Sequence, residues 1–395
     1  MIGFDEAVAI VRRNASPIGT ETVPLGEAAG RVLAAPVIAR IDSPRADVSA
    51  MDGYAVREAD LAEFPARLSV VGKSFAGRGW DGTLGPGQCV RIFTGAPVPG
   101  GADRVVIQEN VRREGDAAIV DSPPGQALHI RRRGGDFVIG DALLGAGRRL
   151  DPRAITAAAA ADLHRVEVYR QPRVHILATG DELAEPGSAS QSPVAIAESV
   201  SFGVSALASD WGAQVVGRTR LGDDLAAMEG AAAETLEAAD LVIVTGGASV
   251  GEKDFAKAMF EPAGLELLFS KVAIKPGKPV WLGRAGDTLI LGLPGNPTSA
   301  LVTARLLLAP LLAGLTGRDI AEALRWRDVP IATPLDAAGA RETFHRARFD
   351  GGKARVLSNQ DSSAQKTLAE ADLLVRQRAN APALAAGERV EALEF

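Results

Sequence analysis

Cysteine and histidine are scarce in this chain of 395 residues, which contains one cysteine and four histidines. A single cysteine excludes an internal disulfide and a metal site built from several thiolates. Cys89 lies in a β-like run, Gln-Cys-Val-Arg-Ile-Phe, so we expect it to be buried and unreactive. The histidines, at positions 129, 164, 175 and 345, lack the spacing of metal ligands, and no zinc or haem site is predicted.

The sequence also lacks abundant aromatic residues and an excess of positive charge. Aromatics make up 5% of the residues, so we expect no dominant platform for stacking bases. The net charge of −6 argues against a general nucleic-acid binder, which is normally basic. The basic run Arg131–Arg133 is better interpreted as a solvated or salt-bridging face between domains than as a nucleic-acid patch. We predict no nucleic-acid partner.

No hydrophobic run has the length expected of a membrane span. The longest strongly apolar stretch, Leu306–Leu315, is ten residues long and contains Pro310, whereas a spanning helix needs ~20 residues. Near the N-terminus, charges such as Asp5 and Arg12 interrupt an amphipathic helix pattern, which is not typical of a signal peptide. We therefore expect a cytoplasmic protein with no membrane partner.

Three regions of different character follow one another along the chain. From about residue 25 to 150 the sequence is rich in Gly, Pro and short β-like runs, which is typical of all-β structure. From about 172 to 318 strands and helices alternate, which predicts an open, mostly parallel α/β sheet. A smaller β-type unit follows from about 326, with a hairpin over 344–357 whose turn is rich in glycine.

Polar turns follow three of the predicted parallel strands, at 173–178, 241–245 and 288–293. In open α/β sheets ligands bind beyond the carboxyl ends of the strands, so these turns mark a candidate site. The turn at 246–251 resembles a phosphate loop without either usual glycine signature, and a tight strand-to-helix turn is the alternative. The three turns are Thr179-Gly180-Asp181-Glu182, Gly246-Gly247-Ala248-Ser249 and Pro294–Ser299.

Two lysines stand between prolines, Lys275 and Lys278 in Ala-Ile-Lys-Pro-Gly-Lys-Pro. Proline fixes its own φ and restricts the residue before it, so the backbone beneath both ammonium groups is well defined. Pro297-Thr298-Ser299 opens an apolar, helix-like run whose first turn would present free N–H groups and hydroxyls. Fixed cations facing a helix N-terminus predict a receptor for a small oxyanion or a phosphate.

Five acidic residues stand beside turn residues rather than on regular faces: Asp52, Asp136, Glu182, Asp223 and Asp254. Together they predict oxygen ligands for Mg²⁺, which binds carboxylates and substrate phosphates. Each also has a structural interpretation. Asp52 fits an ordinary turn, Glu182 a solvated loop, and Asp223 and Asp254 fit helix N-caps.

Several motifs, in order over nearly the whole chain, resemble those of the molybdopterin molybdenumtransferase (MoeA) family, to which the gephyrin E domain also belongs. They are Ser-Ala-Met-Asp-Gly-Tyr-Ala (49–55), Arg-Ile-Phe-Thr-Gly-Ala-Pro-Val-Pro-Gly-Gly-Ala-Asp (91–103), Arg-Arg-Arg-Gly-x-Asp (131–136), Thr-Gly-Asp-Glu-Leu (179–183), Gly-Gly-Ala-Ser-Val-Gly (246–251), the lysine–proline turn and Leu-Pro-Gly-Asn-Pro (293–297).

The resemblance implies a multidomain homodimer of α/β plus β class. A β-rich domain is inserted into a linker domain and is followed by an open, mostly parallel α/β molybdopterin-binding domain and a C-terminal β-barrel. The implied active cleft combines Asp52, Thr94 and Asp136 of one subunit with the α/β domain of the other. The implied boundaries are 1–24, 41–50 and 137–171 for the linker, 25–40 and 51–136 for the β-rich domain, 172–324 for the α/β domain and 325–395 for the barrel.

The implied reaction joins molybdate to an adenylylated molybdopterin, releases AMP and yields molybdenum cofactor. The adenylylating enzyme and molybdoenzyme chaperones are further candidate partners. The implied catalytic residues are Asp52, Thr94, Asp136, Glu182, Asp223 and Asp254, of which Glu182, Asp223 and Asp254 would hold Mg²⁺. The implied molybdate ligands are Lys275, Lys278, Ser299 and Arg346. The other implied substrate-binding residues are Thr179, Gly180, Asp181, Gly246, Gly247, Ser249, Pro294, Asn296 and Pro297.

Four positions depart from the family pattern. Glu198-Ser199-Val200 stands where Asp/Asn-Ser-Asn is usual, in the loop that would face the pterin, and Gly135 replaces a usual Glu. In the C-terminal unit, 360–364 lacks a usual following Arg, and Asp372 replaces Asn. The departures leave open a divergent, non-catalytic paralogue that binds a pterin as a carrier or scaffold. The sequence does not distinguish molybdenum from tungsten.

Overall fold

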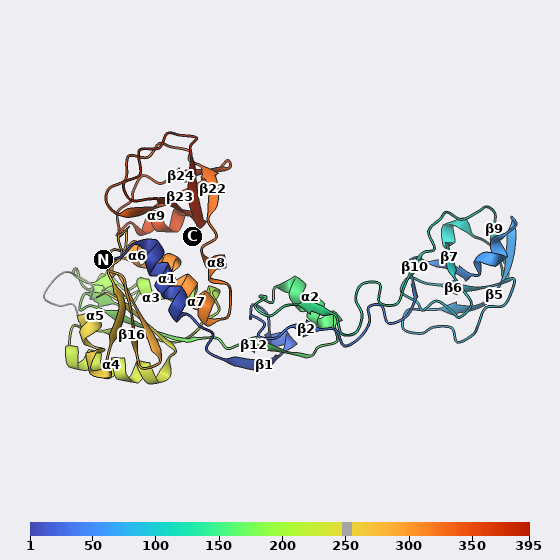
Figure 1. Ribbon diagram of the computed structural model, residues 1–395, viewed down its shortest axis with the longest axis horizontal. Coiled ribbons are helices and arrows are strands. Elements are labelled where there is room, and N and C mark those ends of the chain that lie inside the picture. The colour runs from blue at the N-terminus through green and yellow to red at the C-terminus, as the bar shows by residue number, and fades with distance from the viewer. Residues whose placement is uncertain (247–254) are drawn as a thin grey trace.

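The computed structural model describes residues 1–246 and 255–395, which form a compact body and a long arm (Figure 1). The body comprises the N-terminal helix and residues 172–246 and 255–395, and both chain termini lie in it. The arm comprises residues 20–171 and ends in the β-rich domain, at the opposite end of the molecule from the body (Figure 1). Three predicted site residues, Gly247, Ser249 and Asp254, lie outside the described residues.

A six-stranded sheet forms the centre of the α/β domain. Helix α3 (Val200–Asp210) lies between β13 and β16 in the chain, and helix α4 (Leu225–Ala238) lies between β16 and β17. In contrast, β20 and β21 are joined by the two-residue turn Gly286-Asp287, which only antiparallel strands accept. The predicted mostly parallel sheet is therefore mixed, with an antiparallel edge. The strand order is β16 (Gln214–Leu221), β13 (Arg173–Thr179), β17 (Leu241–Thr245), β21 (Thr288–Leu293), β20 (Trp281–Ala285) and β18 (Glu266–Ser270).

Helices cover the sheet and complete its core. A continuous helical segment consists of α6 (Pro297–Thr303), a π-helical turn (Ala304–Leu308) and α7 (Ala309–Leu315). By length and composition this segment could cross a membrane, but 94% of its most apolar window is buried inside the body. It is therefore the core helix of the body. The other helices are α3 (Val200–Asp210), α4 (Leu225–Ala238), α5 (Phe255–Ala258) and α8 (Ile320–Ala323).

The N-terminal helix α1 (Phe4–Asn14) packs into the core of the body. Its apolar stripe of Phe4, Ala7 and Val11 is buried there, and the Phe4 ring packs edge-on against Phe344, 5.0 Å between centroids. This packing revises the predicted assignment of residues 1–24 to the linker, because an amphipathic helix lies where it can bury its apolar stripe. The chain enters the arm only at β1 (Thr20–Pro24), which pairs with β12 (Arg165–Tyr169).

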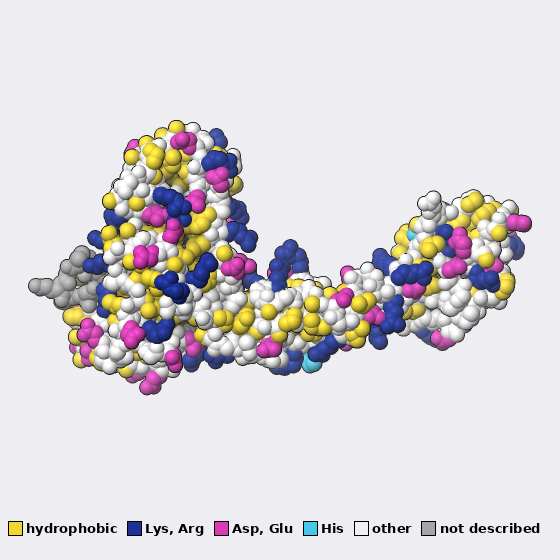
Figure 2. Space-filling model, viewed as in Figure 1, with side chains coloured by type: hydrophobic (Ala, Val, Ile, Leu, Met, Phe, Trp, Pro, Cys, Tyr) yellow, Lys and Arg dark blue, Asp and Glu magenta, His cyan; other side chains and the backbone are white. Residues whose placement is uncertain are grey.

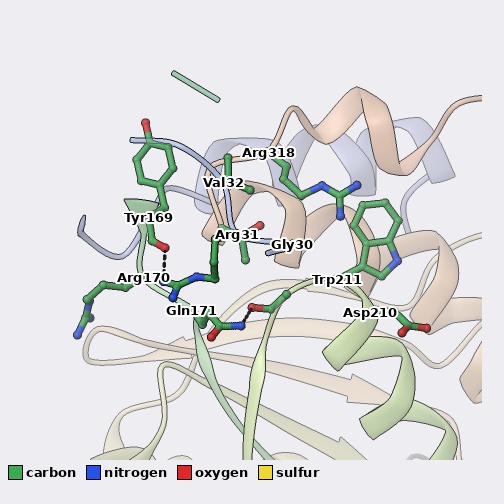
Figure 3. A pocket seen from close by; sticks show the side chains of 11 residues that line it. Gly30, Arg31, Val32, Tyr169, Arg170, Gln171, Asp210, Trp211 and Arg318 are labelled. Atoms are coloured by element: carbon green, nitrogen blue, oxygen red, sulfur yellow. Dashed lines mark hydrogen bonds between the residues drawn. The ribbon is translucent and has the colours of Figure 1, made fainter. Parts of the chain in front are cut away.

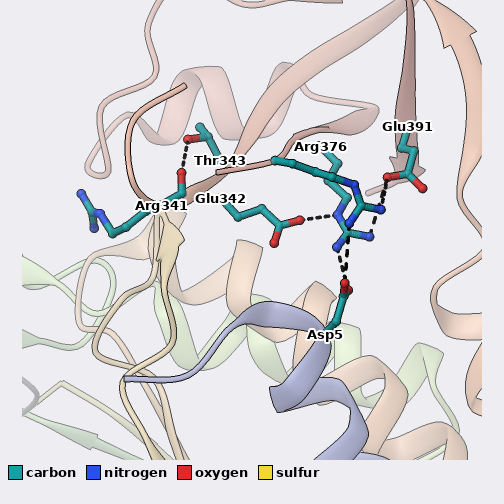
Figure 4. A network of polar contacts seen from close by, with 7 residues as sticks. Asp5, Arg341, Glu342, Thr343, Arg376 and Glu391 are labelled. Carbon is teal, nitrogen blue, oxygen red and sulfur yellow. Dashed lines mark hydrogen bonds and ion pairs between the residues drawn. The ribbon is translucent and has the colours of Figure 1, made fainter. Parts of the chain in front are cut away.

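An ionic network joins α1 to the C-terminal unit around Arg376 (Figure 4). The Arg376 side chain is 5% exposed and donates to the carboxylates of Glu342 and Asp5. Its guanidinium also lies 5.1 Å from the centroid of the Phe4 ring. Bonding to Glu342 and Asp5 keeps the pKa of Arg376 above its ordinary value despite burial. The network therefore couples the first helix to the last domain.

The C-terminal unit is a second sheet, in the order β19, β23, β25, β26, β22, with β24 paired to β23. The predicted hairpin is confirmed: β23 and β24 are antiparallel, and Gly351 and Gly352 turn between them with positive φ. A bridge from Ile331 brings the end of β22 to β24. The elements are β19 (Ile274–Lys275), β22 (Arg327–Pro330), β23 (Glu342–Asp350), β24 (Lys353–Val356), α9 (Gln365–Glu370), β25 (Leu373–Gln377) and β26 (Arg389–Glu394).

Three clusters of buried apolar residues form the cores of the arm. Near the body, Leu33, Val37 and Ala39 pack with helix α2 (Pro152–Ala160), so the segment 25–40 belongs to the linker core and not to the predicted β-rich domain. At the far end, the β-rich domain contains the other two clusters, one of which includes Cys89. Cys89 is fully buried, as predicted, and burial raises the pKa of its thiol to about 12.

The strands of the arm form one six-stranded sheet and several pairs. In the β-rich domain the order is β7 (Arg104–Ile107), β4 (Gly53–Val56), β6 (Gln88–Ile92), β5 (Ala66–Ser74), β9 (Ala117–Val120), β8 (Arg112–Glu114). In the linker, β2 (Val37–Ile38) pairs with β11 (Ala142–Leu144). A further pair, β3 (Val48–Ser49) with β10 (Ile130–Arg131), lies at the β-rich end of the arm, where Ile130 packs against the core that contains Ile92 (Figure 1).

Candidate active site

A pocket of about 650 Å³ lies at the carboxyl ends of β13, β17 and β21. Its volume falls within the range of small-molecule sites. Most of the predicted strand-end residues converge there, and Ser363 and Gln365 from the C-terminal unit complete the wall. The predicted site residues that line it are Thr179, Gly180, Glu182, Asp223, Gly246, Pro294, Asn296, Pro297 and Ser299.

Three glycines allow the strand ends to approach one another. A side chain at Gly246, whose φ is +93°, would place its Cβ 2.4 Å from the carbonyl oxygen of Thr179. A Cβ at Gly295 would lie 3.3 Å from the Cα of Gly246. At Gly180 (φ +146°) a Cβ would meet the Glu182 carboxylate at 2.6 Å. Close backbone packing therefore favours glycine at 246 and 295, and the positive φ favours it at 180, where the Glu182 side chain could move aside.

Three carboxylates line this pocket, those of Glu182, Glu198 and Asp223. The backbone N–H of Asp223 donates to Asp181 Oδ1 at 2.9 Å, which joins the first turn to the loop after β16. The N-cap of α4 is Asp224, whose Oδ1 accepts from Ala227 N at 3.1 Å, so the helix-cap interpretation of Asp223 is wrong. Among the described residues no group of three His, Cys, Asp or Glu side chains is placed to hold a metal ion.

The C-terminal unit covers the N-terminus of α6. The backbone N–H of Thr298 donates to the carbonyl of Ser362 at 3.2 Å, and Asn296 Nδ2 donates to Ser362 Oγ at 2.9 Å. At least one backbone N–H group in the first turn of α6, predicted to be free, is therefore hydrogen-bonded within the protein. The Asp-Ser-Ser sequence at 361–363, with its turn-forming residues, is the only sequence signal that could have indicated this contact.

The two lysines do not line this pocket. Lys275 lies on β19, which pairs in parallel with β23, and it lines a neighbouring pocket of about 700 Å³ against the C-terminal unit. Lys278 is exposed. Gly277 between them has φ +107° and packs on Thr303 in the last turn of α6, rather than at the N-terminus of that helix. The lysine–proline turn therefore lies beside the strand-end pocket, with Pro279 alone reaching it.

Arg346 is fully buried within the C-terminal unit. Its guanidinium donates to the backbone carbonyls of Asp361 (3.1 Å) and Asn359 (3.3 Å), and burial lowers its pKa. The neighbouring Gln360 exchanges hydrogen bonds with the backbone of Arg346 at 3.0 Å. In this arrangement Arg346 holds the loop that covers α6, and does not reach an open pocket.

The residues at 198–200, which differ from the usual family pattern, have a local structural role. Glu198 is 5% exposed and is bonded to the first turn of α3, because its carboxylate accepts from Ser201 N at 2.8 Å and from Ser201 Oγ at 2.5 Å. Arg218 also donates to Ser201 Oγ at 3.1 Å. Val200 contributes to the core of the body and to the pocket wall. This part of the pocket therefore presents an apolar side chain beside a carboxylate that is already hydrogen-bonded.

Asp52 and Thr94 form a pair at the far end of the arm. Asp52 Oδ1 accepts from both the backbone N–H (2.7 Å) and the hydroxyl (2.8 Å) of Thr94. These bonds, with a smaller contribution from Arg91, hold the pKa of Asp52 below its ordinary value. Asp136 is exposed on the loop where the arm narrows. Asp52 precedes β4, Thr94 follows β6 and Asp136 follows β10, so all three belong to the arm, whereas the strand-end pocket lies in the body of the same chain (Figure 1).

The basic run beside Asp136 makes local ion pairs. Arg132 pairs with Asp47 at 2.5 Å and Arg133 with Asp42 at 2.6 Å. The interpretation of this run as a salt-bridging face is confirmed, since both pairs join the two chain segments that connect the linker to the β-rich domain.

A smaller cavity lies where the arm joins the body, lined by residues that include Arg31, Tyr169, Trp211 and Arg318 (Figure 3). The Arg318 guanidinium lies 4.2 Å from the Trp211 ring centroid, and Arg31 donates to the Tyr169 carbonyl at 2.8 Å. At about 20 Å³ the cavity has room for about one water molecule, so it is a junction and not a ligand site.

Three family models match successive parts of the chain. Residues 2–161 match the MoeA N-terminal region (domain I and II), residues 175–314 a probable molybdopterin binding domain, and residues 328–395 the MoeA C-terminal region (domain IV). Together they account for both the arm and the body.

Curated relatives and solved structures agree with these matches. A molybdopterin molybdenumtransferase of Haemophilus influenzae is 40% identical over 85% of this chain and 81% of its own length. Molybdopterin molybdenumtransferase 2 of Mycobacterium tuberculosis is 37% identical, over 89% and 88%. The crystal structure of a molybdopterin biosynthesis MoeA protein from Pyrococcus horikoshii is 26% identical, covers 100% of both chains and has a TM-score of 0.84.

Proposed function

Because the chain belongs to the molybdopterin molybdenumtransferase family, we propose that its strand-end pocket binds the pterin and phosphate of an adenylylated molybdopterin. The protein is a transferase of molybdenum cofactor biosynthesis. The assignment of the pocket rests on one observation: three polar strand-end turns converge around a cavity of about 650 Å³. Such a position, beyond the carboxyl ends of parallel strands, is where α/β sheets bind phosphorylated ligands.

Mg²⁺ fits the residues of this pocket. It commonly uses one or two carboxylates together with substrate phosphate oxygens, and Glu182 and Asp223 supply two carboxylates in one pocket. When bound, the ion would neutralise phosphate charge during loss of AMP. Asp254, the third predicted ligand, lies outside the described residues. Asp181, held by the backbone N–H of Asp223, would orient the loop that carries this second carboxylate.

The lysine–proline turn would attract molybdate. Molybdate and the substrate phosphate are both anions, and bringing them together costs Coulomb energy unless cations lie nearby. Lys275 and Lys278 make no side-chain ion pair or hydrogen bond within the described residues, so their charges are available to an incoming anion. Ser299, buried at the start of α6, belongs to the strand-end pocket and would contact the phosphate side. Arg346 would act through the loop at 359–361, by holding it in place.

A homodimer with shared clefts would bring Asp52, Thr94 and Asp136 to the strand-end pocket of a second subunit. Within one chain these residues belong to the arm and the pocket belongs to the body, which supports this proposal (Figure 1). Apolar side chains are exposed along the linker, including Ile38 (40%), Val138 (45%) and Ile139 (64%), and hydrophobic atoms are visible across this region (Figure 2). The closure of the C-terminal sheet into a barrel, through the Ile331–Ala354 bridge, belongs to the same proposed architecture.

Release of AMP tests the proposed function. Purified protein, given adenylylated molybdopterin, Mg²⁺ and molybdate, should release AMP in a molybdate-dependent manner. Glu182→Gln should abolish the release while leaving the fold intact, because the carboxylate lies on a loop at the pocket wall. Pterin binding without any AMP release by the wild-type protein would contradict the proposal and indicate a carrier or scaffold.

A further inference from the structure

Two phenylalanines form a stack on the β-rich domain, directly beside the Asp52–Thr94 pair. The rings of Phe75 and Phe93 lie 4.8 Å apart between centroids with an interplanar angle of 9°. Phe75 is 45% exposed, so part of the stack is open to solvent. Phe93 immediately precedes Thr94, which places the stack and the hydrogen-bonded carboxylate on neighbouring backbone.

Two cations flank this stack on the same face of the sheet. In the parallel pair β5 and β6, Lys73 lies opposite Arg91, two residues before Phe75 and Phe93 respectively. Alternate residues of a strand point to one face, and the Arg91 guanidinium lies 4.7 Å from the Phe93 ring centroid. The result is a row of two cations next to a row of two aromatic rings.

Neither cation forms an ion pair within the described residues, although the charge of Arg91 also acts on the Asp52 carboxylate. Arg91 donates to the Gly53 carbonyl and to Gln108, both uncharged, and Lys73 makes no ion pair within the described residues. Like charges directly opposite one another on neighbouring strands are destabilising. An anion bound between Lys73 and Arg91 would relieve this repulsion, and an adjacent aromatic face would hold a flat ring.

We propose that this surface binds the adenylyl group of the substrate, with the purine stacked on Phe75 and the phosphate drawn to Lys73 and Arg91. Purines stack on aromatic side chains, and a nucleoside monophosphate supplies the ring and the anion on one molecule. The proposal rests on the proposed function, since it assigns one part of that substrate to the arm. A long nucleic-acid strand fits less well, because the stack contains two rings and the chain carries a net charge of −6.

The experiment is a titration of the full-length protein with AMP, and separately with adenosine, by calorimetry. Phe75→Ala should lower the binding affinity for both ligands by a factor of about 5 to 30, because stacking is lost. Phe75→Tyr, which keeps the aromatic face, should bind both as the wild type does. Lys73→Ala should lower the affinity for AMP by a factor of about 3 to 5 and leave the affinity for adenosine unchanged. The affinity for AMP should also depend less on salt concentration in this variant. The matched control is Phe349→Ala, which removes a ring that is 54% exposed on the C-terminal unit, and it should change neither affinity.

The outcomes separate this inference from the proposed function. Unchanged AMP affinity in both Phe75→Ala and Lys73→Ala would overturn the adenylyl site, and release of AMP from the adenylylated substrate by the wild type would still uphold the transferase. Equal loss of AMP and adenosine binding in Lys73→Ala would also overturn it, since a charge should act on the phosphate alone. Loss of affinity in Phe75→Ala together with its retention in Phe75→Tyr supports a stacking role over a general loss of fold.

Discussion

The strand-end pocket of the body and the Asp52–Thr94 surface of the arm differ in how completely the fold encloses them. The pocket has walls from three strand-end turns and from the C-terminal unit, whose Ser362 is hydrogen-bonded to the start of α6. The arm presents a hydrogen-bonded carboxylate and a phenylalanine stack on an open surface, with Thr94 exposed. The first region is an enclosed pocket, whereas the second is an open surface that carries polar and aromatic side chains.

This difference extends to the ionic contacts that hold each region. Arg376 of the body is 5% exposed and is surrounded by carboxylates and aromatic rings. Arg132 of the arm is 57% exposed and has one partner, Asp47, which is 36% exposed. The ionic contacts of the body are therefore more buried than those of the arm. Four experiments would break or sharpen this comparison.

The largest effect is expected when each half of the proposed active site is disabled in turn. Asp52→Ala and Glu182→Ala should each reduce AMP release more than about 100-fold. Co-expressing the two variants should restore about a quarter of wild-type activity, because half of the dimers are mixed and each mixed dimer has one intact site of two. Activity of the co-purified dimers would be measured.

The control for this complementation pairs two variants of the same half. Co-expressed Asp52→Ala and Asp136→Ala both damage the arm, so their mixed dimers have no intact site and should stay inactive. Mixed dimers of Asp52→Ala and Glu182→Ala that remain inactive would mean that both halves act within one chain.

The next largest effect concerns stability. Arg376→Met should lower the free energy of unfolding by about 3 kcal/mol, because it leaves the nearly buried Glu342 carboxylate without its partner. Arg132→Met in the arm should cost less than about 1 kcal/mol, since exposed pairs contribute little. Urea unfolding followed by circular dichroism measures both. Similar decreases in the free energy of unfolding of the two variants would contradict the proposed difference between body and arm.

A smaller effect is expected at the loop that closes the strand-end pocket. Arg346→Met should weaken binding of molybdopterin about 10-fold, because the 359–361 loop loses two hydrogen bonds from the guanidinium. Arg348→Met, two residues along β23 and exposed, is the matched control and should bind normally. If Arg346→Met binds molybdopterin normally but loses molybdate affinity, Arg346 contacts the oxyanion directly.

The smallest effect is a change in pH dependence at Asp52. Its pKa in the folded protein is below the unfolded value, so its contribution to stability is present above the unfolded pKa and is lost as the pH falls through the folded pKa. Thr94→Val removes the hydroxyl donor and should raise this pKa toward the ordinary value, whereas Thr94→Ser should retain it. An NMR titration of the Asp52 carboxyl carbon measures the shift, and an unchanged pKa in Thr94→Val would mean that the backbone N–H suffices.

Local patterns in the sequence predicted much of the fold. The strands at 117–120, 241–245 and 288–293 and the hairpin at 344–357 follow from alternation, β-branched residues and glycine turns, which act over a few neighbouring residues. The antiparallel edge of the α/β sheet was not predicted, because the sequence signal for it is a single two-residue turn. The segments 1–24 and 25–40 were assigned to the wrong cores, since burial of an apolar stripe depends on which surface is available in the folded chain.

By itself the sequence determined the family, the order of its motifs and the polar turns that converge at the strand ends, because each is written in a few consecutive residues. Only the tertiary structure decided that Lys275 faces a neighbouring pocket, that Arg346 is buried beneath the loop over α6, and that Phe75 stacks on Phe93 in a chain poor in aromatic residues. These placements join residues that are distant in sequence. They depend on how the domains pack and on which charges that packing buries, and no local pattern specifies either.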